Sequence, residues 1–423
     1  MKELRHRSRS MGWVLRGLIK TGGYTDYDLE CPIVQVVNTW SEWNPGHNHL
    51  RHVSEAVKRG VWSAGGFPLE YNTLSLCPGQ TLPNRNLLAM ETEAVFLSEP
   101  ADAAVFICTC DKDVPAMLMA AARVNIPSIF VLGGSMLPGR WRGEDVVCCS
   151  DYQRFDPAHR AGLISDQEWS ELLECMFPCS GACGPLGTAN TDQAIAEALG
   201  MALPGAACVP AVTARLPALA EESGRLVMQL LKEDIKPRDV MTEKALENAI
   251  RVLMAIGGST NLVIHLIALA KMLDLELPIE RFDDLSRDTP YIADVKPSGR
   301  FAAVDLNRAG GIPAVMKEIS SLLHLDALTV TCKTLGENIA EAEVKDRAVI
   351  HPFEKPISAE GGLAILKGNL APDGAVIKHV GARDKSLLQH EGPGLVFNSS
   401  RDAYKALLKE DLDVTPEHVL VLR

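Results

Sequence analysis

The sequence predicts an α/β protein in two parts: a large N-terminal α/β domain with a parallel-type sheet, residues 1–355, and a β-rich C-terminal domain, residues 356–423. Three observations support this prediction. In the first half, short β-rich runs alternate with helical patterns, which is typical of layered α/β folds. Most of the middle has helical periodicity, and from about Pro356 the sequence changes to Gly- and Val-rich pieces.

The first half contains three runs that we expect to be buried strands: residues 34–37, 103–108 and 128–132. A helix is expected between the first two, because Leu50, Val53, Val57 and Val61 recur at helical spacing before a Gly-Gly pair that ends helices. Pro115 suits the first turn of another helix after Asp113. A capping box, Ser165 with Glu168, predicts a third helix start.

Four more helices are expected in the middle: residues 192–199, 219–232, 244–256 and 262–273. The C-terminal part contains two β-like pieces, residues 361–366 and 374–377, and it ends on the apolar run Val419–Leu422. A strand-like run makes a poor natural terminus, so we expect this domain to be incomplete, that is, C-terminally truncated.

Composition limits the possible partners. Hydrophobic residues make up 47% of the chain, the net charge is −12, and no dense block of Lys and Arg occurs, so neither nucleic acid nor membrane is expected as a partner. The most apolar stretch, residues 252–271, is interrupted by Gly, Ser, Thr, Asn and His. Eleven cysteines without an export signal favour a reducing, cytoplasmic location.

The segment Ile107–Pro115 carries the first candidate chemistry. It follows an expected strand, where open α/β sheets bind ligands. The thiolate of Cys110 suits a soft metal or a cluster, the carboxylate of Asp111 is a hard oxygen ligand, and Lys112 could act as a base or be modified. The alternative interpretation is a strand end with a helix-capping Asp and a solvated Lys.

Three further segments combine small and polar residues. Residues 178–191 contain Cys183 in a turn before a helix. Residues 257–261 bring Ser259, Thr260 and Asn261 between two helices, where they could bind a polyol or a carboxylate. Ser135 follows an expected strand and has the same potential. Residues 257–261 could equally be a Gly C-cap followed by a Ser/Thr N-cap, and so could residues 133–136. Motifs of nucleotide-binding enzymes and serine hydrolases are absent from the sequence.

In order along the chain, these pieces resemble the family of dihydroxy-acid dehydratases and sugar-acid (aldonic acid) dehydratases, which are iron–sulfur hydro-lyases. The similarity covers nearly the whole chain. The matching segments are residues 38–42, 56–61, 64–68, 85–87, 110–112, 133–136, 181–191, 257–261 and 368–374. Trp40-Ser41-Glu42 and the opening His6-Arg7-Ser8 are more similar to the sugar-acid branch.

The resemblance implies an α/β domain followed by a β-barrel-like domain, in a homodimer or homotetramer. It also implies elimination of water from a 2,3-dihydroxy carboxylate to give a 2-keto-3-deoxy acid. The implied cofactors are an iron–sulfur cluster, 2Fe-2S, held by three cysteines, and Mg²⁺.

The implied site residues follow by position. Cys110 and Cys183 match cluster ligands, Asp111 matches a Mg²⁺ ligand, and Lys112 matches a lysine that is carboxylated to a carbamate. Gly46 stands where the third cluster cysteine is expected; His47 could substitute for it, as could Cys77, Cys108 or Cys179.

Two further departures concern Mg²⁺ and the base. Pro78 stands where an acidic Mg²⁺ ligand is expected. The serine base of the family is expected beyond Arg423, so this chain is expected to supply no catalytic base of its own.

The expected function is therefore dehydration of an aldonic acid such as arabonate or xylonate. The alternative within the same class is a dihydroxy-acid dehydratase of branched-chain amino-acid synthesis. An alternative of another class is a catalytically inactive relative or fragment with a binding or structural role, which the departures at Gly46 and Pro78 favour.

Overall fold

The structure is a computed structural model that describes residues 12–77, 82–99, 101–382, 384–409 and 411–423. Its strands are β1 (Ile33–Asn38), β2 (Phe67–Asn72), β3 (Ala103–Cys108), β4 (Ser128–Leu132), β5 (Gly139–Trp141), β6 (Glu144–Val146), β7 (Ala364–Gly368), β8 (Ala371–Ile377), β9 (Gly394–Phe397) and β10 (Val419–Leu422). Two predicted features, Pro78 and the opening His6-Arg7-Ser8, lie outside the described residues.

The helices of the first half are α1 (Trp13–Lys20), α2 (Asp26–Glu30), α3 (Leu50–Ser63), α4 (Leu82–Ser98), α5 (Asp113–Val124), α6 (Ser150–Arg160), α7 (Asp166–Met176) and α8 (Thr188–Ala198). Those that follow are α9 (Arg215–Glu233), α10 (Pro237–Val240), α11 (Glu243–Ala255), α12 (Asn261–Met272), α13 (Glu280–Arg287), α14 (Ala303–Arg308), α15 (Gly311–Glu318), α16 (Leu335–Ile339) and α17 (Ser400–Leu407). The helix periodicity and the predicted capping box of Ser165 and Glu168 are confirmed.

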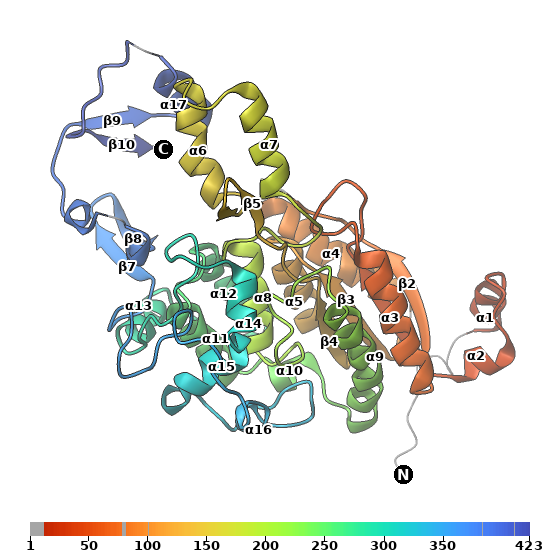
Figure 1. The fold of residues 1–423 in the computed structure, drawn as a ribbon. Coiled ribbons are helices and arrows are strands. Elements are labelled where there is room, and N and C mark those ends of the chain that lie inside the picture. Colours follow the sequence, from red (N-terminus) through yellow and green to blue (C-terminus); the bar gives the residue numbers. More distant parts are fainter. Residues whose placement is uncertain (1–11, 78–81, 100, 383, 410) are drawn as a thin grey trace. The chain divides into compact units, whose positions relative to one another are not determined.

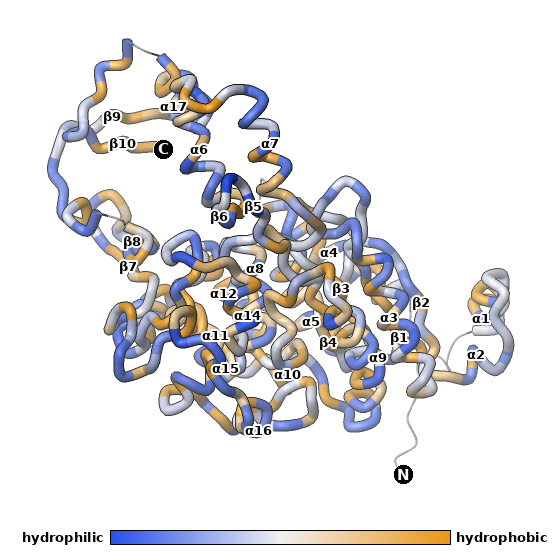
Figure 2. Tube along the Cα trace, viewed as in Figure 1, coloured by the Kyte–Doolittle hydropathy of each residue, from blue (hydrophilic) through white to orange (hydrophobic). Residues whose placement is uncertain are grey.

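A four-stranded parallel sheet with the order β2-β1-β3-β4 forms the centre of the N-terminal part. Every residue of β1, β3 and β4 is buried, as expected for a parallel sheet with helices on both faces. Figure 1 shows α3 and α9 on one face and α4 with α5 on the other. Along α3 and α9 the chain alternates between hydrophilic and hydrophobic residues, as in helices with one buried face (Figure 2).

The strand order reverses between β1 and β3. From β1 the chain moves outward to β2, whereas from β3 it moves in the opposite direction to β4. Such a switch point leaves a crevice at the carboxyl ends of the two strands, because their following loops turn to opposite sides. The segment after β3 begins with Thr109 and Cys110, so it lies at this crevice.

The chain divides into two units, residues 1–381 and 382–423. The first contains the parallel sheet, the helices up to α16 and the antiparallel pair β7-β8; the second contains the parallel pair β9-β10 and α17. This division differs from the predicted border between residues 355 and 356, which stays a prediction. In the described part after residue 355 the strands form two-stranded sheets and no closed barrel.

None of the described helices is both long enough and apolar enough to cross a membrane.

Two glycines allow α3 and α9 to cross at close range. A β-carbon on Gly60 would lie 2.0 Å from the carbonyl oxygen of Glu221, and one on Gly224 would lie 2.2 Å from that of Val57. Both distances are far below van der Waals contact, so only glycine permits this backbone approach. The crossing fixes one helical layer of the sheet.

The substitution Gly60→Ala is therefore expected to lower the free energy of unfolding by about 2 kcal/mol or more, because the added methyl group forces the two helices apart. The matched control is Gly17→Ala in α1, where an added β-carbon meets nothing within 4 Å. That change should raise the free energy of unfolding by up to about 1 kcal/mol through helix propensity. Urea unfolding followed by circular dichroism measures both, and equal midpoints for the two variants would contradict the crossing geometry.

Helix α8 is anchored from inside the protein by Glu197. Its carboxylate accepts hydrogen bonds from the backbone N–H groups of Gly205 and Ala207, each at 2.7 Å. Burial raises the pKa of Glu197 to about 7, although these N–H groups act in the opposite direction. The folded protein therefore holds a proton that the unfolded chain releases above pH 4.5.

Stability should consequently fall as the pH rises from 4.5 to about 7 and then level off. The contribution of this one group is roughly 3 kcal/mol across that window, at about 1.4 kcal/mol per pH unit. The variant Glu197→Gln cannot ionise, so its unfolding free energy should lack this decline. Urea unfolding of both proteins across the window provides the comparison, and parallel pH profiles would show that Glu197 does not titrate in it.

Candidate active site

The ends of β1 and β3 are tied together by one buried carboxylate, that of Asp113. Its Oδ2 accepts hydrogen bonds from the backbone N–H of Thr109 at 2.9 Å and from the hydroxyl of Thr39 at 3.3 Å. The ring of His47 faces the same oxygen at 3.2 Å, and both side chains are fully buried. Asp113 thus fixes the loop after β1 against the loop after β3.

His47, the predicted substitute ligand, is already engaged. Nδ1 contacts the hydroxyl of Ser75, and Nε2 faces Asp113. Burial alone would lower the pKa of His47, but the charge of Asp113 and the hydrogen bond to it raise this pKa above its usual value. Both ring nitrogens thus already face a polar side chain, so metal ligation would require His47 to leave Ser75 or Asp113.

Gly46 lies directly beside Cys110. A β-carbon on Gly46 would lie 2.6 Å from the sulfur of Cys110, so a side chain at this position would project onto that thiol. The thiol of Cys77 contacts Cys110 instead, and this hydrogen bond lowers the pKa of Cys77 and raises that of Cys110. The other two predicted substitute ligands have different environments. The thiol of Cys108 is buried, and the sulfur of Cys179 accepts a hydrogen bond from Leu137 N at 3.3 Å.

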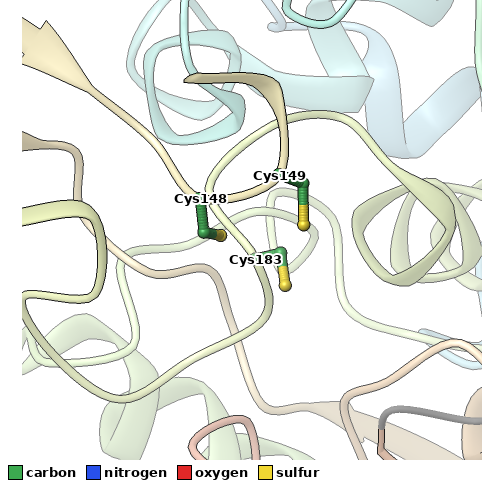
Figure 3. A group of neighbouring side chains, drawn as sticks. All are labelled: Cys148, Cys149 and Cys183. Atoms are coloured by element: carbon green, nitrogen blue, oxygen red, sulfur yellow. The ribbon is translucent and has the colours of Figure 1, made fainter. Parts of the chain in front are cut away.

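Cys183 lies in a second thiol group with Cys148 and Cys149 (Figure 3). The three sulfur atoms all lie within 4.8 Å of one another. Hydrogen bonds from Cys148 and Cys183 lower the pKa of Cys149 to about 3, while the pKa of Cys148 rises to about 12 because it faces that thiolate. The three form a possible metal site that the sequence alone does not indicate.

The three-cysteine set that the resemblance implies does not fit this chain as it stands. Position 46 has no side chain, Cys110 pairs with Cys77, and Cys183 belongs to the group with Cys148 and Cys149. We therefore derive no chemical step from a cluster on Cys110 and Cys183.

Asp111 and Lys112 lie among buried charges from three other helices. Lys112 Nζ is 2.9 Å from Asp111 Oδ2, and its side chain is only 7% exposed. Burial raises the pKa of Asp192 in α8 well above its usual value, and the charge of Asp111 adds to this, whereas Lys112 and Arg85 oppose it. Asp192 Oδ2 is buried without a hydrogen-bond partner, so it offers an oxygen that a cation could use.

Arg85 and His265 complete this group of charges. Arg85 Nη1 lies 2.9 Å from His265 Nδ1. Burial, followed by the charges of Arg85 and Lys112, lowers the pKa of His265 to about 3, so its ring is neutral. The Arg85 segment is among those that resemble the family, but the sequence alone indicates no role for Arg85, Asp192 or His265. Residue type alone gave no signal, since their proximity depends on how α4, α8 and α12 pack around α5.

The predicted hydroxyl and amide residues lie at the adjacent N-termini of α8 and α12. The hydroxyl of Ser259 lies 2.9 Å from that of Thr188, and Asn261 Nδ2 donates to Thr188 at 3.0 Å. Thr260 is the N-cap residue of α12, and the three predicted residues there are all partly exposed. Two helix N-termini side by side favour an anion through their dipoles, although several N–H groups at the start of α12, those of Asn261, Leu262 and Val263, already donate within the protein.

Ser135 has a different environment. It is fully buried, its hydroxyl accepts from Asn190 Nδ2 at 3.0 Å, and its backbone pairs with Ala182 and Pro210. These contacts join the loops after β4 and before α8, so the geometry gives Ser135 a structural function. Its predicted contact with substrate stays a prediction.

A cavity of about 610 Å³ lies elsewhere, between the edge strand β2 and helices α1 and α4. Its lining includes Leu15, Leu69, Tyr71 and Val95 and none of the predicted site residues. We therefore locate the candidate active site by its chemistry, at the switch point, and not by cavity size.

Comparisons with known proteins agree with the resemblance. The family models described as dihydroxy-acid/6-phosphogluconate dehydratase N-terminal and C-terminal match residues 31–338 and 348–423. A dihydroxy-acid dehydratase of Moorella thermoacetica is 45% identical over 419 residues, which cover 96% of this chain and 75% of the relative. Proteins with that name from Ignicoccus hospitalis (44%) and, as dihydroxy-acid dehydratase 1, Methanosarcina acetivorans (42%) have the same coverage.

Proposed function

Since the chain belongs to the dihydroxy-acid/6-phosphogluconate dehydratase family, we propose that it is a hydro-lyase that removes water from a 2,3-dihydroxy carboxylate. The names of its relatives favour a dihydroxy acid, such as 2,3-dihydroxyisovalerate, over the sugar acid expected from the Trp40-Ser41-Glu42 motif. The observation that carries the proposal is the position of Asp111 and Lys112 at the switch point, where their charges act on Asp192 in the second turn of α8 and that of Lys112 on His265 in the second turn of α12.

The substrate carboxylate is proposed to bind at the N-termini of α8 and α12. Ser259, Thr260 and Asn261 supply partly exposed hydroxyl and amide groups there, and Thr188 links Ser259 to Asn261. The helix dipoles attract a negative charge, and the hydroxyl groups can exchange hydrogen bonds with the hydroxyls of the substrate. Binding at this position directs the reacting carbons toward Asp111 and Lys112.

A Mg²⁺ ion is proposed to use the oxygens of Asp111 and Asp192. Both are carboxylates, and one oxygen of Asp192 has no partner within the protein. When bound, Mg²⁺ supplies positive charge that stabilises the enolate-like charge at the substrate carboxylate. The ammonium group of Lys112 would repel such an ion, whereas carboxylation of Lys112 to a carbamate would turn it into a further oxygen ligand.

The neutral ring of His265 and the guanidinium of Arg85 support this arrangement. Arg85 is held by its contact with His265 and by hydrogen bonds to Asn86. The fixed positive charge of Arg85 favours the ionised form of Asp192, although burial has the larger effect and raises the pKa of Asp192. Arg85, positioned by His265, is thus proposed to lower the cost of ionising Asp192 when a cation binds.

A second candidate is a member of the family that no longer catalyses the reaction. Gly46 supports it, because this position faces the sulfur of Cys110 but has no side chain. Such a protein would retain the fold and a small-molecule site without turnover.

An assay for keto-acid formation distinguishes these functions. We expect the chain with Mg²⁺, purified without oxygen, to convert 2,3-dihydroxyisovalerate at least about tenfold faster than arabonate or xylonate. The variant Asp111→Asn removes a charged ligand oxygen and should lower kcat/KM by roughly 100-fold or more. The matched control, Asp145→Asn, changes an exposed carboxylate in β6 and should leave turnover unchanged.

Two outcomes would contradict the proposal. If arabonate or xylonate were converted faster than 2,3-dihydroxyisovalerate, the substrate would be a sugar acid, as the Trp40-Ser41-Glu42 motif led us to expect. Absence of turnover on all three acids would favour the non-catalytic relative, and recovery of turnover in Gly46→Cys would then identify the lost side chain as the cause.

A further inference from the structure

The thiols of Cys148, Cys149 and Cys183 come from two loops that the fold holds together. Cys148 and Cys149 follow β6, and Cys183 precedes α8. The loops touch one residue away from the thiols, where a β-carbon on Gly184 would lie 2.9 Å from Val147 Cγ1. Their packing therefore requires glycine at position 184.

Lys296 joins the same two loops from a third segment. Its Nζ donates to Asp151 Oδ2 at 2.9 Å, and its carbonyl oxygen accepts from Leu186 N at 2.7 Å. Asp151 also accepts from Val147 N at 2.8 Å. The backbone on both sides of the three thiols is thus held by buried or partly buried hydrogen bonds, as in sites that bind a ligand without rearrangement.

The backbone at Cys149 has a strained conformation that helps to bring the three thiols together. Cys149 has φ 64° and ψ −62°, and Ser150 N donates to Cys148 O at 2.7 Å across it. This is a γ-turn of the rare form with positive φ, which costs free energy for a residue with a β-carbon. The turn allows two consecutive cysteines to direct their sulfur atoms to the same side, near Cys183 (Figure 3).

The spacing of the sulfur atoms suits one small ion. A tetrahedral Zn²⁺ with Zn–S bonds of about 2.3 Å holds its sulfurs about 3.8 Å apart. The three atoms here lie within 4.8 Å of one another, so small side-chain rotations bring all three onto one ion. An iron–sulfur cluster distributes its thiolates over several metal atoms and needs a wider arrangement.

We propose that Cys148, Cys149 and Cys183 bind a single thiolate-preferring divalent ion of the Zn²⁺ class, with the fourth position open. Cys148 is buried, whereas Cys149 is exposed, so an ion can enter from solvent and water can complete the tetrahedron. Cys183 then serves this site and not a cluster with Cys110. The proposal stands on the three sulfur positions and does not depend on the dehydratase activity.

The test is metal binding by the full chain after chelation under reducing conditions. Competition with a chromophoric chelator should give one tightly bound Zn²⁺ per chain, and Co²⁺ should give the visible and charge-transfer bands of a tetrahedral thiolate site. Cys149→Ser and Cys183→Ser should each weaken Zn²⁺ binding at least about tenfold. Gly184→Ala should weaken it as well, because it separates the loops without removing a thiol.

Matched controls are Cys77→Ser and Cys332→Ser, which alter partly exposed thiols outside the group and should leave binding unchanged. Circular dichroism verifies folding; if Cys183→Ser does not fold, the exposed Cys149 decides the question. The proposal would be overturned by unchanged Zn²⁺ binding in Cys149→Ser or by loss of binding in Cys77→Ser. It would also be overturned by a disulfide among Cys148, Cys149 and Cys183 that persists under reducing conditions, or by inorganic sulfide bound at this site.

Discussion

The candidate active site depends on the carboxylate of Asp113. This side chain is fully buried at the first residue of α5, where it accepts from Thr109 and Thr39 and faces His47. An unpaired charge at such a position would be costly, so the loops after β1 and β3 must both supply partners. The partners gather on Oδ2, while Oδ1 is buried without a hydrogen-bond partner. Through this one oxygen the protein fixes the backbone that presents Cys110, Asp111 and Lys112 at the switch point.

From this point the chemistry separates into two regions. Asp111, Lys112 and Asp192 form a charged region toward α8 and α12, whose N-termini suit an anionic substrate. The thiols form another region, divided between the pair Cys77 and Cys110 and the group of Cys148, Cys149 and Cys183. Hard oxygen ligands and soft sulfur ligands thus occur on neighbouring loops but in separate groups, which permits different metals in each.

The sequence predicted the parallel sheet and the main helices well, because periodicity and turn residues are local signals. It did not predict β2, Phe67–Asn72, which contains Pro68 and Glu70. An edge strand tolerates both residues, since its outer side needs no partner. The segment Cys110-Asp111-Lys112 was found from its place after a strand. The proximity of Asp192, Arg85 and His265 was not, because it depends on helix packing over separations that no local pattern contains.

For the cysteines, matching sequence positions to a family is not enough to assign metal ligands. By position in the sequence, Cys183 and Cys110 both match cluster ligands of the family. In the structure, however, the neighbours of Cys183 are Cys148 and Cys149, which the resemblance did not indicate. A thiol is defined chemically by its neighbours, because hydrogen bonds and burial set which sulfur is ionised and which metal it can hold. Because residue 46 is glycine, it offers no side chain to the sulfur of Cys110. The thiol of Cys77 contacts that sulfur instead. Family membership therefore defines the fold of this chain, whereas the neighbours of each thiol are seen only in the structure.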